Sequence, residues 1–462
     1  MAHANLGLAL AALGQPADAA THYLEALRHR PDYAEAYQHL GLAHFNMNEQ
    51  EEAIRCFREA IRLKPTAEAY FDLGTALVQQ ELLPQAESCY RKSLELKPNL
   101  TAAHSSLGAL LEHAGKLDDA LACYDRALAL QPRDANSQWK RALILLAQGR
   151  FKEGWPAYEW RWHRQDALPL RFERPLWDGA PLCGRRILLH SEQGIGDTIQ
   201  FIRYAPLVQE RGGRVIFACP QPLAPLLSRC KGIDEIVTHG PVPPSFDVHA
   251  PLMSLPRLFE TALDTIPAPV PYVFADPDLV ASWRQELSTL KGFKVGIAWQ
   301  GSPRNINDRQ RSMPLQCFAP LARLPDVHLI SLQKGPGEEQ LRAVPPEWHI
   351  IDFAHRLDES AGPFMDTAAV ILNLDLVISC DSVVGHLAGA LGAPVWLALP
   401  APADWRWLLA REDSPWYPTM RLFRQRQRGN WDDVFKRLAT ALAEEMRQPS
   451  KLSTLQEGAR RV

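Results

Sequence analysis

A short segment near the middle of the chain, SEQGIGDTIQF at residues 191–201, combines a carboxylate with two glycines at a predicted turn. Gly194 and Gly196 would permit a tight bend and close approach of a ligand, and helical spacing begins at Asp197. A helix start favours an anion, and a carboxylate at this point could accept a proton from a hydroxyl group. Aspartate is also a preferred helix cap, and spacing alone favours that structural role.

A second segment, CDSVVGHLAGALGAP at residues 380–394, predicts the end of a strand, a small polar loop with Asp381, and a helix. Free backbone N–H groups at a helix start can bind a diphosphate. Here they belong to three residues: Ser382, Val383 and Val384. His386 lies one turn into the helix, where a lone histidine is more often structural than catalytic. The glycines of this segment could equally serve only close packing of the helix on a sheet.

A third segment, WQGSPRNINDRQRSMPL at residues 299–315, brings Ser302 together with a group of arginines. Arg304, Arg309 and Arg311 follow within a few residues, just after a predicted strand. Arginine suits two-pronged contact with phosphate. The alternative is a solvated loop without a ligand.

Aromatic residues concentrate in a fourth segment, residues 402–418, which holds three tryptophans and a tyrosine. Such rings could stack on a nucleotide base or a sugar. They could equally form a core beneath the site, and we expect that place for Trp407 and Leu408.

The first third of the chain contains an internal repeat, because several residue types recur in register at steps of 34, 33 and 34. The recurring glycines are Gly7, Gly41, Gly74 and Gly108, and the recurring prolines are Pro31, Pro65, Pro98 and Pro132. Aromatic residues recur in the same way: Tyr23, Phe57, Tyr90 and Tyr124. This pattern resembles the tetratricopeptide repeat, and a weaker fifth copy runs through Ala142, Gly154 and Tyr158. The resemblance predicts an α-solenoid over residues 1–162, whose concave face would bind a peptide or protein segment or serve as a scaffold.

The remainder of the chain alternates short apolar stretches with helical spacing, which predicts parallel sheets of doubly wound α/β type. A proline-rich stretch, residues 266–277, divides this pattern into two. The predicted parts are a connector at 163–184, a first Rossmann-like lobe at 185–275, a second at 276–446, and a flexible tail at 447–462. Two such lobes with a closing helix resemble the two-lobed GT-B architecture, which implies an acceptor on the first lobe, a nucleotide-sugar on the second, and ligands in the cleft between them.

Together, GIGDTIQF and SCDSVVGHLAGALGAP resemble motifs of the heptosyltransferase-like family of bacterial GT-B glycosyltransferases, of the glycosyltransferase family 9 type. The resemblance covers roughly residues 185–445 and implies that Asp197 deprotonates an acceptor hydroxyl for inverting displacement. It implies a donor site at these residues: Gly194, Gly196, Ser302, Arg309, Arg311, Asp381, Ser382, Val383, Val384 and His386. The chain departs from the family in two places. Arginines stand where the family has a lysine, and Val383 stands where the family has a glycine.

Composition excludes several classes of function. The net charge of −3 gives no overall field that would draw nucleic acid, and no stretch approaches the roughly 18 apolar residues of a membrane-spanning helix. The apolar N-terminus could suggest a secretion signal, but its residues fit the first repeat. The eight cysteines form no CxxC pair, which favours a reducing cytoplasm. No DxD motif stands where a metal-dependent transferase would use it, so we expect neither metal nor cofactor.

Two functions of different classes fit these observations. The tandem of repeats and transferase-like lobes is similar to protein O-glycosyltransferases, in which repeats recruit the protein acceptor. The first hypothesis is therefore a glycosyltransferase that moves a sugar from a nucleotide-sugar to a protein or glycan. The second is a repeat adaptor that carries a silent transferase domain. Another two-lobed enzyme, such as an epimerase, would need a further acid/base pair, for which His190, Glu192 and His386 are the nearby candidates.

Overall fold

The computed structural model describes these residues: 1–164, 172–238, 245–305 and 307–447. It has two units, one formed by Met1–Ile144 and Ala157–Ala167 and the other by Leu145–Pro156 and Leu168–Val462. The predicted tail beyond Arg447 and part of the predicted connector at 163–184 lie outside the described residues.

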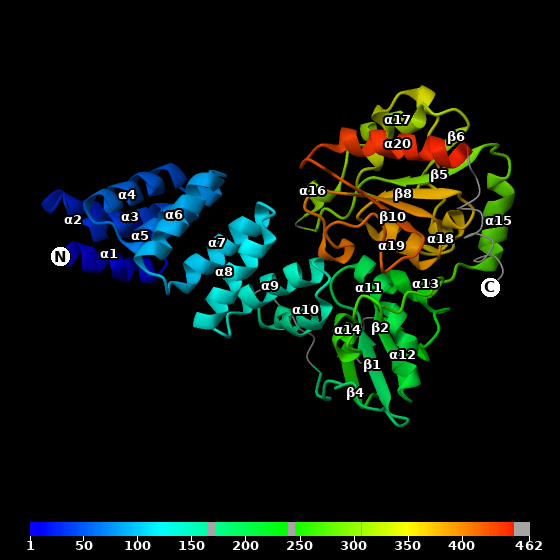
Figure 1. The fold of residues 1–462 in the computed structure, drawn as a ribbon, viewed down its shortest axis with the longest axis horizontal. Helices are drawn as coiled ribbons and strands as arrows, with labels where there is room; N and C mark the ends of the chain where they lie inside the picture. The colour runs from blue at the N-terminus through cyan, green and yellow to red at the C-terminus, as the bar shows by residue number, and fades with distance from the viewer. Residues whose placement is uncertain (165–171, 239–244, 306, 448–462) are drawn as a thin grey trace. The chain divides into compact units, whose positions relative to one another are not determined.

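The N-terminal unit is a row of helical hairpins that follow the repeat (Figure 1, blue to cyan). Its helices are α1 (Ala2–Ala12), α2 (Pro16–His29), α3 (Ala34–Asn46), α4 (Gln50–Leu63), α5 (Ala67–Gln79), α6 (Leu83–Leu96), α7 (Thr101–His113) and α8 (Leu117–Leu130). Two further helices, α9 (Ala135–Ala147) and α10 (Phe151–Tyr158), cross from this unit into the second.

The repeated glycine is required by the repeated aromatic ring. A Cβ atom on Gly41 would lie 2.6 Å from Cε1 of Phe57, and one on Gly74 would lie 2.7 Å from Cε1 of Tyr90. Real Cβ atoms do not come this close to a ring, so only glycine lets the two helices of a hairpin cross at this distance. The regular spacing of glycine and aromatic residues in the sequence therefore follows from the packing of the two helices in each hairpin.

The second unit begins with a four-stranded sheet, called here the first sheet, in the order β3-β2-β1-β4 with every pair parallel. Its strands are β1 (Arg186–His190), β2 (Arg214–Cys219), β3 (Glu235–Thr238) and β4 (Val248–Pro251). The helices between them are α11 (Ile195–Phe201), α12 (Ala205–Glu210), α13 (Ala224–Leu227) and α14 (Leu255–Leu258).

A second sheet of six parallel strands has the order β10-β9-β8-β5-β6-β7. Its strands are β5 (Phe293–Ala298), β6 (Val327–Ser331), β7 (Ile351–Asp352), β8 (Leu376–Cys380), β9 (Val395–Leu399) and β10 (Met420–Arg424). Its helices are α15 (Pro277–Leu287), α16 (Asp308–Arg311), α17 (Ala319–Ala322), α18 (Met365–Ile371), α19 (Val383–Ala390) and α20 (Trp431–Arg447). Both sheets are thus of the parallel α/β type that the alternating pattern predicts.

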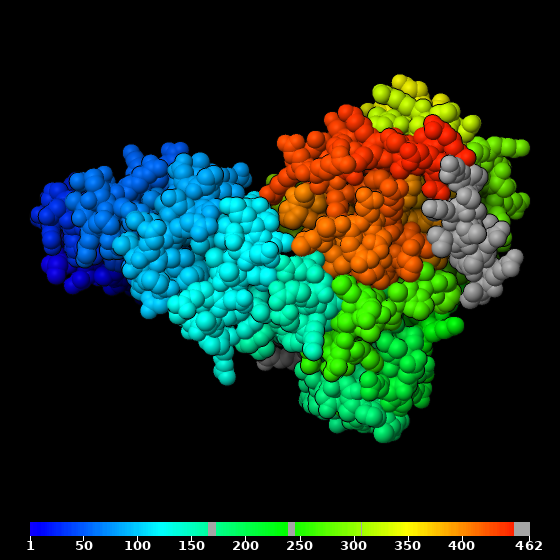
Figure 2. Space-filling model, in the orientation of Figure 1, coloured from blue at the N-terminus to red at the C-terminus, as the bar shows by residue number. Residues whose placement is uncertain are grey.

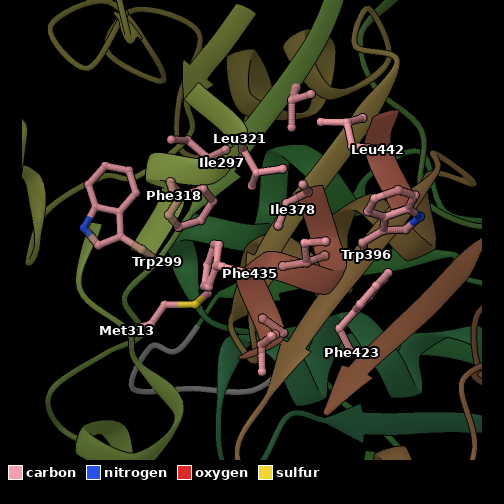
Figure 3. Packing of buried hydrophobic residues seen from close by; sticks show 14 of the residues in the cluster. Ile297, Trp299, Met313, Phe318, Leu321, Ile378, Trp396, Phe423, Phe435 and Leu442 are labelled. Atoms are coloured by element: carbon pink, nitrogen blue, oxygen red, sulfur yellow. The ribbon is translucent and has the colours of Figure 1, made fainter. Parts of the chain in front are cut away.

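One core lies between the second sheet and helix α20 (Figure 3). Ile297 and Ile378 from the strands pack with Phe318, Phe435 and other residues of the α17–α20 side, all of them almost fully buried. The opposite side of α20 forms part of the outer surface (Figure 2, red). This core fixes the central strands, and so it fixes the direction in which the loops after β5, β8 and β9 leave the sheet.

The sequence prediction differs from the structure in three places. β7 is only two residues long and shows no pattern, and β10 alternates arginine with apolar residues, so both were missed. The stretch of helical spacing that begins at Asp197 is not one helix. It is divided into α11, a 3-10 turn and α12, where Pro206 cannot donate the backbone hydrogen bond that a continuous helix needs.

Two features are absent from the described residues. Among those residues, no helix combines the length and apolarity that crossing a bilayer requires. The same part of the chain holds no group of three His, Cys, Asp or Glu side chains arranged to bind a metal ion.

The hairpin packing gives a first prediction. Gly41→Ala should lower the free energy of unfolding by about 1–3 kcal/mol, because the new methyl group overlaps the ring of Phe57. At an ordinary helix position, replacing glycine with alanine raises the free energy of unfolding by up to about 1 kcal/mol. A decrease at Gly41 would therefore by itself indicate the overlap with the ring. Urea unfolding followed by circular dichroism measures it. As a control, Gly41→Ala combined with Phe57→Leu should lose less than the sum of the single losses, and an additive double variant would contradict the packing explanation.

Candidate functional site

The candidate site lies at the carboxyl edge of the second sheet. β5, β8 and β9 are neighbours and run parallel, so the segments that follow Ala298, Cys380 and Leu399 leave the sheet at the same edge. The chain passes from β5 to β6 on one side and returns to β8 on the other. Such a reversal of strand order is where α/β sheets bind ligands.

Asp381 stands directly after β8, at the start of helix α19. Only 9% of it is exposed, and burial, followed by the nearby charge of Asp404, raises its pKa to about 6. Trp407 and the charges of Arg311 and Arg406 act in the opposite direction. Ser382 is the residue before α19, and its hydroxyl lies 3.1 Å from that of Ser379, so it does not cap the helix.

The N-terminus of α19 follows the predicted arrangement, because the helix begins at Val383 and continues through Val384 to Ala390. Val384 is buried and Val383 is half-buried. Ser382, the N-cap residue, makes no side-chain capping hydrogen bond, so the first N–H groups of the helix are available to an anion.

Arg311 is the predicted arginine that the structure brings to this edge. Its Nε lies 3.3 Å from Oδ1 of Asp308, and its charge acts on Asp381. The hydroxyl of Ser312 accepts from Gly301 N–H and donates to Asp308, which closes the loop after β5 around this pair.

Ser302, Arg304 and Arg309 lie elsewhere on the same loop. All three are exposed, and among the described residues none has a side-chain hydrogen bond or ion pair with Asp381, Arg311 or helix α19. The structure therefore separates Arg311 from the other two arginines that the sequence grouped with it.

The segment after β9 contributes a residue that sequence reasoning did not select, Arg406. Its Nη1 donates to Oδ1 of Asp404 at 2.8 Å, and its Nη2 donates to Oδ1 of Asp197. The guanidinium also lies 4.3 Å over the ring of Trp405. Trp407 and Leu408 are buried, as the sequence predicted.

Asp197 reaches this edge from the first sheet. The sequence analysis places the start of a helix at Asp197. Helix α11 begins two residues earlier, at Ile195, so Asp197 is its third residue. Its Oδ2 accepts from the backbone N–H of Gly194 at 2.8 Å, and its Oδ1 accepts from Arg406. Gly194 is therefore the N-cap, and the prediction of Asp197 as the cap residue is wrong: Asp197 accepts the Gly194 N–H from the third helical position and also lies in the candidate site.

His386 joins the two sheets beside this pair. A Cβ on Gly196 would lie 2.8 Å from Cδ2 of His386, so the glycine lets α11 approach the ring. His386 Nδ1 lies 2.9 Å from the hydroxyl of Tyr417, and its Nε2 lies 4.0 Å from Oδ1 of Asp381. Burial, then the charges of Arg406 and other arginines, lower its pKa to about 3, so the ring is neutral near pH 7.

A buried arginine fixes α11 against the second sheet. Arg203 donates to the backbone oxygens of Trp416 at 2.6 Å and Pro267 at 3.3 Å, and to the hydroxyl of Tyr272 at 2.7 Å. It also stacks on the ring of Tyr417 at 4.8 Å. Carbonyl and aromatic contacts thus stabilise this charge, and no carboxylate accepts a hydrogen bond from it among the described residues.

Aromatic side chains from three segments pack together beside the same region. Trp155 of α10 donates through Nε1 to the Thr261 carbonyl at 3.1 Å, and its ring meets that of Trp405 edge-on at 5.4 Å. Phe201 of α11 lies 6.4 Å from Trp155, also edge-on. Trp155 therefore contacts both the helix that carries Asp197 and the segment that carries Arg406.

Four carboxylates and two guanidinium groups make up what we call the acid–arginine cluster: Asp197, Asp308, Asp381, Asp404, Arg311 and Arg406. Carboxylates outnumber arginines in this set, which agrees with the raised pKa of Asp381. His386, being neutral, leaves the excess of negative charge unchanged.

The comparisons with known proteins agree with the repeat and add a relative. A tetratricopeptide repeat model matches residues 5–66 and 40–101, and a second TPR repeat model matches 113–149. Protein FlbA of Caulobacter vibrioides is 30% identical over an alignment of 463 positions, which covers 95% of this chain and 72% of FlbA. The chain belongs to the FlbA family.

Solved structures resemble a third of this FlbA-family chain. MamA is 21% identical, covers 33% of the chain and 91% of its own length, and gives a TM-score of 0.32. PilF of Pseudomonas aeruginosa is 20% identical, covers 34% and 73%, and gives 0.33. YrrB, described as a TPR protein with an unusual peptide-binding site, is 25% identical, covers 34% and 81%, and gives 0.29.

The site explains which residues of this FlbA-family member sequence reasoning missed. Asp404 and Arg406 follow a buried parallel strand, and polar residues at that place are a general signal of a ligand site, but the neighbouring tryptophans dominated the pattern. Arg203 and Trp155 gave no comparable signal, because their roles depend on contacts between segments far apart in the sequence.

The raised pKa of Asp381 gives a second prediction. Well below about pH 4 this carboxyl is protonated in both the folded and the unfolded chain, whereas between about pH 4 and 6 it is ionised mainly in the unfolded chain. The folded state therefore loses stability as the pH rises through this window, and the loss is complete above it. Asp381→Asn should remove the loss and raise the free energy of unfolding at pH 8 by up to about 3 kcal/mol, with little gain at pH 4.

Urea unfolding at pH 4 and pH 8 measures this difference. Ser382→Ala, which removes no titrating group from the same loop, is the matched control and should change stability equally at both pH values. A destabilised Asp381→Asn variant at pH 8 would show that the carboxylate is stabilised, not penalised, at its place.

Proposed function

We propose that this FlbA-family protein is a glycosyltransferase of GT-B type that moves a sugar from a nucleotide-sugar donor to a protein or glycan acceptor. The proposal rests on one arrangement. Two arginines and a helix start without a side-chain cap lie at the same edge as a carboxylate that comes from the other sheet. The arginines are Arg311 and Arg406, the helix is α19, and the carboxylate is Asp197.

The donor half of the proposal follows from electrostatics. As the bond from the sugar C1 to the phosphate oxygen breaks, the electron pair leaves with the nucleoside diphosphate. Fixed N–H dipoles and guanidinium groups that face this developing charge lower the barrier. The start of α19 would hold the diphosphate, Arg311 would neutralise it, and Asp381 would hold the donor ribose.

The acceptor half uses Asp197. An acceptor hydroxyl would attack C1 on the face opposite to the leaving group, which forms the new C1–O bond with inversion, and its proton would pass to the Asp197 carboxylate. Neutral His386, held by Tyr417, would line the site beside Asp197 without taking the proton. The chemistry uses only the sugar donor and the acceptor.

The repeats supply a reason for a protein acceptor. Tetratricopeptide arrays offer an extended concave surface for peptide or protein segments, and this chain carries such an array on the same polypeptide. We propose that the array recruits the acceptor protein. The alternative function, a repeat adaptor with a silent transferase domain, would keep this surface and bind no donor.

A thermal-shift screen tests the donor site. We expect one of UDP, GDP, ADP, CMP and dTDP, or its sugar conjugate, to raise the melting temperature by about 5 °C at a hundredfold excess over its Kd. Arg311→Ala should abolish most of the shift, because this side chain belongs to the acid–arginine cluster. Arg309→Ala is the matched control from the same loop and should keep the shift, because that side chain is exposed.

The outcomes separate the two functions. A melting-temperature shift that depends on Arg311 supports a donor site. Product formation with a protein acceptor should then depend on the presence of the repeats. No shift with any nucleotide, in a protein that unfolds cooperatively, would reject the glycosyltransferase and favour the adaptor.

A further inference from the structure

We propose that Arg406 has two positions, one on Asp197, as in this structure, and one on the diphosphate of the bound donor. Donor binding would thereby release the Asp197 carboxylate for the acceptor. This inference rests on the proposed function and adds an order to it, in which the donor must bind before the acceptor hydroxyl can lose its proton.

The contacts of Asp197 give the first reason. Its Oδ1 accepts a hydrogen bond from Arg406, and its Oδ2 accepts one from Gly194 N–H at 2.8 Å, so both carboxylate oxygens are already hydrogen-bonded. The pair is little exposed, with 9% of the Arg406 side chain and 17% of the Asp197 side chain accessible, so water screens it weakly. A base in this position must lose the guanidinium before it can serve a substrate hydroxyl well.

Arg406 has a second anchor that allows the exchange. Asp404 Oδ1 accepts from Arg406 Nη1 at 2.8 Å and from Arg406 backbone N–H at 3.0 Å, while the ring of Trp405 lies beneath the guanidinium. Only Nη2 contacts Asp197. A rotation of the side chain could therefore exchange Asp197 for a phosphate oxygen while Asp404 keeps the arginine in the site.

The backbone beneath Arg406 is held in place, so the side chain is the part that can move. Leu408 has φ 57° and ψ −168°, a conformation that is almost confined to glycine. Its N–H donates to the Trp405 carbonyl at 3.1 Å, and Arg424 donates to the Trp407 carbonyl, which together maintain this strained turn. Strain of this kind collects at ligand-binding segments, where the surroundings enforce one geometry.

The charge balance gives a reason for the arginine to move. The acid–arginine cluster has four carboxylates and two guanidinium groups, and the charge of Arg406 already acts on Asp381 and on His386. A diphosphate at the start of α19 would bring further negative charge beside Asp381. The guanidinium close to both sites would then be drawn to the phosphate, because it offers a two-pronged contact there.

The simpler interpretation is that the Asp197–Arg406 pair is a fixed brace between the two sheets. The two interpretations differ in what Asp197→Asn does to diphosphate binding. A fixed brace predicts no gain in affinity. An exchanging arginine predicts tighter binding, because the carboxylate that competes for the guanidinium is gone.

Isothermal titration calorimetry on the full chain tests this. The probes are UDP, GDP, ADP and dTDP, with inorganic pyrophosphate as the diphosphate alone. We expect Asp197→Asn to bind the preferred diphosphate about 10-fold more tightly, and Arg406→Gln to bind it about 10-fold more weakly. In the Arg406→Gln background, adding Asp197→Asn should change the affinity less than twofold, because no guanidinium remains to be released.

The double variant is the control for a general charge effect and for folding. Removal of a negative charge from the site would raise affinity in both backgrounds, so a gain that persists with Arg406→Gln overturns the exchange. Unchanged affinity in Asp197→Asn also overturns it and leaves the donor site intact. If no diphosphate binds to the wild type or to Asp197→Asn, the proposed function fails together with the exchange. The melting temperature of each variant without ligand shows that it is folded.

Discussion

The ion pair between Asp197 and Arg406 is the interaction on which the candidate site depends. Asp197 comes from the helix that follows the first strand of one sheet, and Arg406 comes from the segment after β9 of the other. The pair places the Asp197 carboxylate, the proposed base, at the same edge as Arg311 and the start of α19, which are the proposed diphosphate site. The pair marks where the two sheet edges meet, and each edge alone holds only part of the proposed site.

The surrounding contacts explain why such a pair can form at a defined distance. Arg203 binds two backbone carbonyls and the Tyr272 hydroxyl, and Gly196 allows α11 to touch His386. Trp155 adds an aromatic contact to both partners' segments. Burial of these aromatic side chains contributes a large stabilisation that does not depend on the charged pair. The backbone is thus set by packing, and the charges remain free to be exchanged.

Much of the fold could be predicted from the sequence, because its causes are local. The repeat follows from the glycine that each aromatic ring requires, and the strands follow from short apolar stretches with helical spacing between them. The site was predicted only in part. Arg311 and Arg309 look alike in sequence, and only the fold of their loop around Asp308 separates them. Arg406 became visible only when the order of β9, β8 and β5 placed its segment beside Asp381.

A crystal structure of the full chain with the nucleoside diphosphate that stabilises it most would test the donor site and the exchange together. We expect the diphosphate at the N-terminus of α19, with Arg311 and Arg406 on its oxygens and Asp197 no longer paired with Arg406. A diphosphate bound elsewhere would contradict the donor site. A diphosphate at α19 with the Asp197–Arg406 pair unchanged would keep that site and contradict the exchange.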